Sequence, residues 1–263
     1  MSRIAAKFES LKRDGKKSFI PFVTAGDPDL DTSLRIVLKL AELGAGVIEL
    51  GVPFSDPMAD GPTIQRSSQR ALENGTNLAG ILDLVREFRK TSEVPVVLFS
   101  YLNPLWRFGL EKLVGEAAEA GIDGILVTDI VGKEAEQIGN IFAERGIDLI
   151  SLVAPTTTDE RLERIAASAS GFIYAVSRAG VTGARAEASS DAESLVSRVR
   201  KYTALPVAVG FGISTRGQIE DVWRYADGAV VGSAIVAEIE KCGGKDVVDA
   251  VGGFIYELLP SKE

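Results

Sequence analysis

Glu49 is the residue of this sequence whose position most clearly favours chemistry. It interrupts a short apolar run, residues 47–52, which predicts a β-strand, and period-two alternation places it on the same face as Val47 and Gly51. Burying an unpaired carboxylate costs several kcal/mol or forces its protonation, so folding alone does not favour it there. The structural alternative is an ion pair with an arginine. We interpret Glu49 as a candidate catalytic acid or base.

The loop after this strand, residues 53–63, carries two further acids, Asp56 and Asp60, and is stiffened by three prolines. Asp60 followed by Gly61 and Pro62 is also an ordinary turn into a helix with proline in its first turn. Spacing alone therefore leaves a functional and a structural Asp60 equally open. Asp129, just past the fourth apolar run, is a weaker candidate of the same kind.

Glycines follow the last three apolar runs, in residues 177–183, 210–215 and 232–236. Glycine lets backbone N–H groups approach a ligand, and Gly232 with Ser233 opens a predicted helix. A phosphate would be held there by N–H groups and by the helix dipole. One such loop would mean little, because βα loops use glycine for turns, but three in succession favour a phosphate site.

The composition excludes several classes of protein. With 29 basic and 37 acidic residues among 263, the formal charge is −8, which argues against a nucleic-acid or membrane-surface partner. Histidine is absent and Cys242 is the only cysteine, so no imidazole base, disulfide framework or metal site is expected. No apolar run approaches the roughly 18 residues of a membrane span, and the start lacks the pattern of a signal peptide. We expect a cytoplasmic protein.

The elements that must position these residues form one repeating pattern. Short, nearly continuous apolar runs predict parallel strands covered on both faces, at residues 18–24, 47–52, 94–101, 124–128, 147–153, 172–176, 207–210 and 229–232. Helical spacing separates them, and glycines such as Gly44, Gly121 and Gly146 predict helix ends.

Eight alternating units predict a single α/β domain over residues 1–263, a (β/α)₈ TIM barrel with extra N-terminal and C-terminal helices. The alternative is an open doubly wound sheet, but no Gly-x-Gly-x-x-Gly follows the first strand. Active sites of such barrels lie at the C-terminal ends of the strands. No lysine stands there, which argues against a Schiff-base aldolase or lyase.

One stretch is recognisable as a whole. Residues 48–65, IELGVPFSDPMADGPTIQ, resemble the signature of the tryptophan synthase alpha subunit family. Further segments match the family in order, at residues 19–28, 152–158, 177–185, 210–214 and 231–235. The resemblance covers essentially the whole chain. It departs at residues 130–133, where many members carry a proline and glutamates, and at Arg216 and Gly217, which replace a common Pro-acidic pair.

The resemblance implies a retro-aldol cleavage of indole-3-glycerol phosphate to indole and glyceraldehyde 3-phosphate, without metal or Schiff base. It implies that Glu49 and Asp60 are the catalytic carboxylates. It assigns the indole pocket, the partner contact and the phosphate site to a set of further residues: Phe22, Tyr101, Asp129, Tyr174, Thr182, Gly183, Gly212, Gly232 and Ser233.

The resemblance also implies a partner, the tryptophan synthase beta subunit, in an alpha2-beta2 heterotetramer. Pyridoxal phosphate is expected only on that partner, and this chain is expected to carry no cofactor. The exposed, stiff loop with Pro53 and Asp56 is the expected contact. Two alternatives stay open, a non-catalytic phosphate-binding barrel and a stand-alone indole-glycerol-phosphate lyase. Indole-glycerol-phosphate synthase fits less well, because its reaction requires a lysine at a strand end.

Overall fold

The computed structural model describes residues 1–176, 185–210, 212–242 and 246–260, and for 185–189 it describes the backbone alone. Two of the predicted site residues, Thr182 and Gly183, lie outside the described residues.

The described strands form one parallel sheet in the order β5-β4-β3-β2-β1-β9-β8-β7-β6. Their bounds are β1 Ser18–Thr24, β2 Ile48–Gly51, β3 Val96–Ser100, β4 Gly124–Val127, β5 Asp148–Leu149, β6 Ser151–Val153, β7 Ile173–Val176, β8 Val207–Gly210 and β9 Gly228–Val231. The first strand pairs with the last, Ser18 opposite Gly228, as a barrel requires. The prediction of a TIM barrel is confirmed.

The fifth predicted strand is found in two pieces on either side of Ile150. Strand β5 pairs with β4, and β6 pairs with β7, so the chain changes neighbours at this residue. The N–H of Ile150 still donates to the carbonyl of Ile125 at 2.9 Å, which continues the β4 pairing by one step. The barrel is therefore nearly closed. The strand pairing is broken only between β4 and β6, near the C-terminal ends of these described strands.

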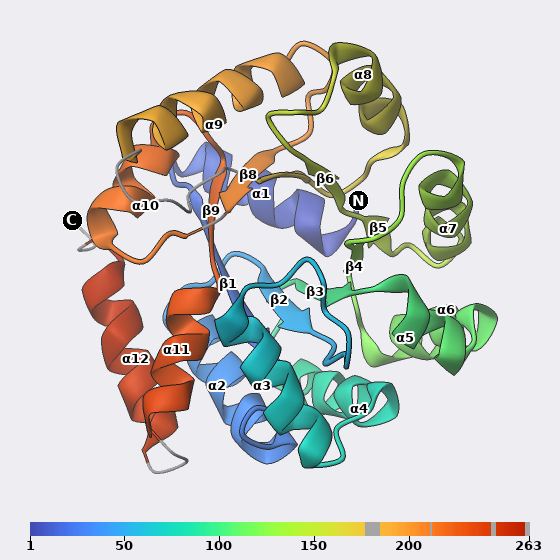
Figure 1. Cartoon of the computed structure of the whole chain (residues 1–263), viewed down its shortest axis with the longest axis vertical. Helices are drawn as coiled ribbons and strands as arrows, with labels where there is room; N and C mark the ends of the chain where they lie inside the picture. The colour runs from blue at the N-terminus through green and yellow to red at the C-terminus, as the bar shows by residue number, and fades with distance from the viewer. Residues whose placement is uncertain (177–184, 211, 243–245, 261–263) are drawn as a thin grey trace.

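Helices surround the strands (Figure 1). Their bounds are α1 Arg3–Arg13, α2 Leu30–Glu42, α3 Pro62–Glu73, α4 Leu78–Arg89, α5 Leu102–Phe108, α6 Leu110–Ala120, α7 Lys133–Ala143, α8 Asp159–Ser168, α9 Arg185–Val199, α10 Arg216–Trp223, α11 Ser233–Cys242 and α12 Val247–Leu258. Gly121 ends α6 with a φ of 88°, the left-handed conformation that glycine adopts without strain.

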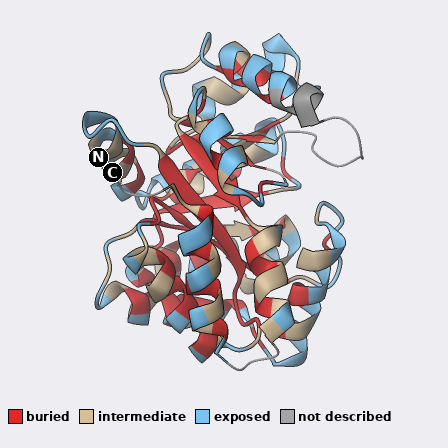
Figure 2. Ribbon diagram, turned by 90° about the vertical axis from the view of Figure 1, so that its left-hand side faces the viewer, coloured by how far each residue is buried: buried red, intermediate tan, exposed pale blue. Residues whose placement is uncertain are grey.

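The core has two parts, and both follow from the strand pattern. Residues on one face of each strand pack outward against the helices, as Ile48 and Leu50 of β2 do. The other face fills the barrel interior together with α1, whose Ile4 and Phe8 close the N-terminal end; the Phe8 ring lies 5.7 Å from that of Phe172. Figure 2 shows the buried strands between helices whose outer faces are exposed.

Both terminal helices are found where the sequence predicts them. Helix α1 plugs the bottom of the barrel, and α12 packs outside against α2 and α11. One departure from the family resemblance has a structural role here, because Arg216 donates from Nε to the carbonyl of Glu257 at 3.0 Å. This bond satisfies a carbonyl at the C-terminal end of α12.

Candidate active site

A cavity of about 440 Å³ opens at the C-terminal ends of the strands. It brings together seven of the predicted site residues: Phe22, Glu49, Asp60, Tyr174, Gly212, Gly232 and Ser233. Other lining residues were not predicted: Ala59, Gly61, Pro62, Thr63, Ile64, Phe99, Thr128, Leu152, Val176 and Val230. Phe99 follows Val97 by two residues on β3, so strand alternation could have found it.

Glu49 is one of the residues that line this cavity. Strand β2 places it opposite Phe22 of β1 and Val97 of β3. Its side chain is 1% exposed, and neither carboxylate oxygen has a hydrogen-bond partner among the described residues. No arginine among the described residues forms the ion pair of the structural alternative. Burial raises the pKa of Glu49 to about 8, so the carboxyl is protonated at neutral pH.

Asp60 reaches the same cavity from the loop before α3. Burial raises the pKa of Asp60 to about 6, and a hydrogen bond donated by the Tyr101 hydroxyl opposes this rise. The Tyr101 oxygen in turn accepts the backbone N–H of Ala59 at 2.9 Å. The turn interpretation also holds, since Pro62 is the first residue of α3 after Gly61. Asp60 therefore lies two residues before the start of α3 and also lines the cavity.

The two carboxyl groups therefore differ in charge at neutral pH. The pKa of Glu49 at about 8 keeps that group neutral, and the pKa of Asp60 at about 6 leaves that group mostly ionised. Two acids held in different protonation states within one cavity can act as a proton donor and as a stabiliser of positive charge.

Aromatic rings form apolar walls, and glycines make room for them. Phe22 meets Phe99 edge to face, with ring centroids 5.2 Å apart. A Cβ at Gly210 would lie 2.2 Å from the Tyr174 hydroxyl oxygen, which no side chain tolerates. A Cβ at Gly51 would lie 2.6 Å from the Phe22 ring. These two glycines therefore admit rings that a larger residue would displace.

Another part of the cavity lining suits a phosphate. Gly232 and Ser233 stand at the start of α11, and Gly212 has a φ of 70°, a conformation that glycine favours. A helix N-terminus offers free N–H groups and the positive end of its dipole to an anion. No lysine or arginine is among the described residues that line the cavity, so backbone groups would carry this contact.

Four predicted residues in the described ranges do not line the cavity: Tyr101, which contacts Asp60 as described above, and Asp129, Pro53 and Asp56. Asp129 accepts the backbone N–H of Leu102 at 2.8 Å and so holds the first residue of α5. Pro53 is buried at the base of the 53–61 loop, and Asp56 is exposed on it, where it accepts a hydrogen bond from Ser55. Met58 of the same loop is 92% exposed.

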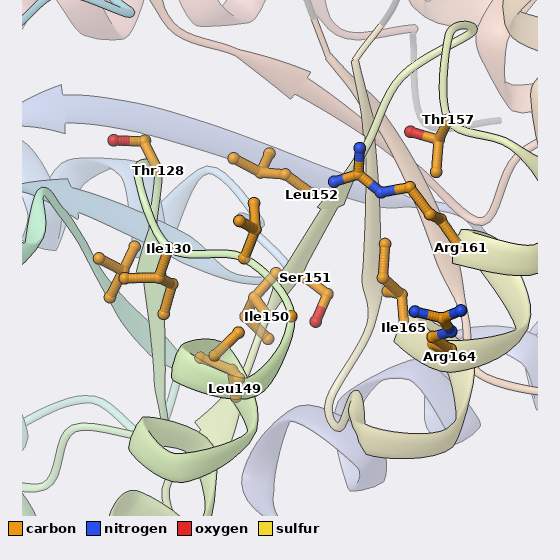
Figure 3. Close-up of a pocket in the computed structure, with 14 residues that line it drawn as sticks. Thr128, Ile130, Leu149, Ile150, Ser151, Leu152, Thr157, Arg161, Arg164 and Ile165 are labelled. Atoms are coloured by element: carbon orange, nitrogen blue, oxygen red, sulfur yellow. The ribbon is translucent and has the colours of Figure 1, made fainter.

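A second cavity, of about 250 Å³, lies where the strand pairing is broken between β4 and β6 (Figure 3). Arg161 and Arg164 of α8 stand on one side of it, and Leu149 and Ile150 are on the other. Residues 130–132, which depart from the family resemblance, line this cavity, whereas none of residues 130–133 lines the active-site cavity. The departure therefore leaves the two carboxylates untouched.

The described ranges contain no cluster of three or more potential metal ligands of the histidine, cysteine, aspartate or glutamate types. Within the same ranges, no helix has both the length and the apolar character to cross a membrane.

Comparison with known proteins gives a consistent result. The family model described as "Tryptophan synthase alpha chain" matches residues 8–252. The alpha chain of Citrifermentans bemidjiense is 50% identical over 98% of this chain and 97% of its own length. The crystal structure of tryptophan synthase subunit alpha from Legionella pneumophila str. Paris superposes with a TM-score of 0.91 at 37% identity, covering 98% of this chain and 97% of that one.

A third relative is a subunit of an assembly. The crystal structure described as the tryptophan synthase complex from Pyrococcus furiosus matches with a TM-score of 0.83 at 41% identity, over 92% of this chain and 97% of that chain. The matched region includes β2, the 53–61 loop and the start of α11, which build the cavity. From sequence, fold and these matches together, the chain belongs to the tryptophan synthase alpha chain family.

Proposed function

We propose that the cavity around Glu49 and Asp60 cleaves indole-3-glycerol phosphate to indole and glyceraldehyde 3-phosphate, the alpha-chain reaction. The observation that carries this proposal is a pair of carboxyl groups in one cavity with opposite protonation. Glu49 is fully buried and has no hydrogen-bond partner in the described part of the chain, and Asp60 accepts a hydrogen bond from Tyr101.

Glu49 moves the protons. Its neutral carboxyl donates a proton to C3 of the indole ring, which becomes tetrahedral while positive charge develops on the ring nitrogen. The resulting carboxylate removes the proton of the side-chain hydroxyl. The bond between C3 and the side chain then breaks, its electron pair returns to the ring, and the hydroxyl carbon becomes the aldehyde. Glu49 ends the cycle protonated, as it began, which fits its pKa of about 8.

Asp60 stabilises the charge that develops between these steps. Its ionised carboxylate accepts the indole N–H and faces the positive charge on the nitrogen. The hydrogen bond from Tyr101 lowers the pKa of Asp60, which favours the ionised form. Tyr101 therefore supports catalysis through Asp60.

The remaining wall residues bind the two ends of the substrate. Phe22, Phe99 and Tyr174 provide apolar surface for the indole ring. Gly212, Gly232 and Ser233 hold the phosphate through backbone groups. Thr182 and Gly183 belong to the same phosphate site by the family resemblance alone.

We also propose that this chain binds a tryptophan synthase beta subunit, which carries the pyridoxal phosphate and consumes the indole in an alpha2-beta2 heterotetramer. Support comes from the Pyrococcus furiosus relative, whose structure is described as a tryptophan synthase complex. The exposed loop with Asp56 and Met58 is the proposed contact. A single cysteine fits a reducing compartment, so the cytoplasm is the proposed location.

The decisive experiment incubates the protein with indole-3-glycerol phosphate and follows the release of indole. The proposal expects turnover by the isolated chain and faster turnover with a beta subunit. A non-catalytic phosphate-binding barrel would bind the substrate and release no indole. A stand-alone lyase would release indole at the same rate with and without every beta subunit tested.

A further inference from the structure

Two neighbouring helices begin at the active-site cavity. Helix α3 starts at Pro62, two residues after Asp60, and α11 starts at Ser233 in the proposed phosphate site; all three residues line the cavity. The two helices pack side by side (Figure 1). Their relative position therefore sets the distance between the proposed indole contact and the proposed phosphate contact.

An ionic tie joins these helices behind the cavity. Arg66 of α3 donates to both carboxylate oxygens of Glu240 on α11, at 2.7 and 2.8 Å, and Arg70 donates to Glu240 at 2.9 Å. The two guanidinium groups hold the pKa of Glu240 at about 2, so the tie stays charged. Glu240 follows Ser233 by seven residues, which places the tie about 10 Å behind the helix start.

Arg70 extends the tie to Asp27, in the loop that follows the first strand. Its Nε and Nη2 donate to the two oxygens of Asp27, at 2.8 and 2.7 Å, and Asp27 is only 2% exposed. One turn earlier on the same face of α3, the hydroxyl of Ser67 lies 2.6 Å from that of Thr24 at the end of β1. Helix α3 is therefore fixed against β1, while Glu240 fixes it against α11.

A hydrogen bond joins α3 directly to the loop that contains Asp60. Gln65, the neighbour of Arg66 in α3, donates from Nε2 to the backbone carbonyl of Asp60 at 2.9 Å. The first turn of the helix and the backbone of Asp60 are thus joined. A shift of α3 relative to α11 would move Asp60 away from a substrate whose phosphate remains at Ser233.

We propose that Glu240 is a positioning residue for the cleavage reaction, which holds α3 against α11 so that Asp60 meets the indole nitrogen of a substrate anchored by its phosphate. The inference rests on the proposed function and adds a residue outside the cavity to it. Arg66 is 52% exposed and Glu240 31%, and pairs exposed to this extent contribute little to stability. The pair acts instead by fixing the position of α3 relative to α11.

The test compares Glu240→Gln with wild type, by kcat and KM for indole-3-glycerol phosphate and by the thermal midpoint. A misplaced catalytic group costs rate, so we expect kcat to fall about 10-fold while KM changes less than about 2-fold. The midpoint should stay close to that of wild type. Glu238→Gln is the matched control, because Glu238 bears the same charge on α11 but pairs with Lys241 of its own helix. The control should keep wild-type kcat.

A double variant separates positioning of Asp60 from general weakening of the enzyme. If Glu240 acts through Asp60, adding Glu240→Gln to Asp60→Asn should cause almost no further loss of kcat. Two independent effects would multiply instead, and that result would overturn the inference. So would an unchanged kcat in Glu240→Gln, or an equal loss in Glu238→Gln. If the wild type itself released no indole, the proposed function would fail first, and the inference with it.

Discussion

Glu49 and Asp123 are both buried carboxylates of this barrel, 1% and 4% exposed, yet their surroundings are opposite. Asp123 precedes β4 at the N-terminal end of the strands and accepts hydrogen bonds from Arg89, Arg3 and the backbone N–H of Val96, at 2.5, 3.1 and 2.8 Å. Glu49 lies toward the other end and accepts none from the described residues.

The comparison shows that burial alone does not identify an acid that takes part in chemistry. Asp123 has the partners that stabilise a buried charge, so it joins strands and helices into a fold. Glu49 lacks them, so its carboxyl is free to exchange protons with a ligand. One barrel thus separates stability at one end from reactivity at the other.

Replacing Glu49 tests the reactive end and should have the largest effect. Glu49→Gln keeps the shape of the side chain but cannot exchange protons, so kcat for indole release should fall by about 10²–10⁴-fold. Indole formation under substrate saturation measures this. A variant that retained more than about a tenth of wild-type kcat would remove Glu49 from the mechanism.

The same variant should be more stable than wild type at alkaline pH. The pKa of Glu49 is about 8 in the folded chain against an ordinary 4.5, so between these values the folded state keeps a proton that the unfolded state has lost. The free energy of unfolding of wild type therefore falls as pH rises through this window. In Glu49→Gln the side chain does not titrate, so the free energy of unfolding does not fall for this reason. Urea unfolding at pH 5 and pH 8 measures it, and equal pH dependence of both proteins would refute the raised pKa.

Replacing Asp123 tests the structural end. Asp123→Ala leaves the guanidinium of Arg89, 10% exposed, without its carboxylate, and should lower the free energy of unfolding by about 3–5 kcal/mol. The kcat of the folded fraction should not change. Asp83→Ala is the matched control, because Asp83 is 72% exposed beside Arg86 and should contribute less than about 1 kcal/mol. A loss of kcat in Asp123→Ala at full folding would break the comparison.

The pH profile sharpens the comparison within the active site. The proposed mechanism requires ionised Asp60 and protonated Glu49, so kcat/KM should be greatest between pH values of about 6 and about 8, the two pKa values. Tyr101→Phe removes the hydrogen bond that lowers the pKa of Asp60, so the acidic limb should move to higher pH. The alkaline limb should stay in place. Movement of both limbs together would contradict the separate assignments.

The smallest expected effect lies on the rim. Asp56 is exposed and has no catalytic role, so Asp56→Ala should keep basal indole release. We expect it to lose most of the activation by a beta subunit, because the loop that carries it also carries Asp60. Titration of the partner into wild type and variant measures this, with Asp14→Ala, an exposed acid at the end of α1, as the control. Equal activation of all three proteins would place the contact elsewhere.

Much of the fold could be predicted because parallel strands buried on both faces leave a continuous apolar signal. Strand β1 has the predicted bounds, and the alternation along β2 correctly placed Glu49 inside and Ile48 outside. The break at Ile150 could not be predicted, because residues 147–153 contain no glycine or proline that would mark the end of a strand. The partners of β5 and β6 differ, and pairing partners are a property of the assembled sheet.

The site was predictable in its residues and not in its contacts. Residue types and spacing identified Glu49 and left Asp60 open, and the family resemblance supplied Tyr101. That Tyr101 donates to Asp60 joins residues 41 positions apart, and no local pattern encodes it. Among the described residues Glu49 has no hydrogen-bond partner, and this likewise depends on all the residues that surround it in the fold.

The pairing of the first strand with the last has a consequence for synthesis of the chain. Residues 18–21 cannot complete their hydrogen bonds until residues 228–231 have left the ribosome. Until then β1, buried along its whole length in the finished barrel, presents an open apolar edge. A chain that stops before β9 keeps that edge for its lifetime, so premature termination before residue 228 yields an aggregation-prone product rather than a weakened enzyme.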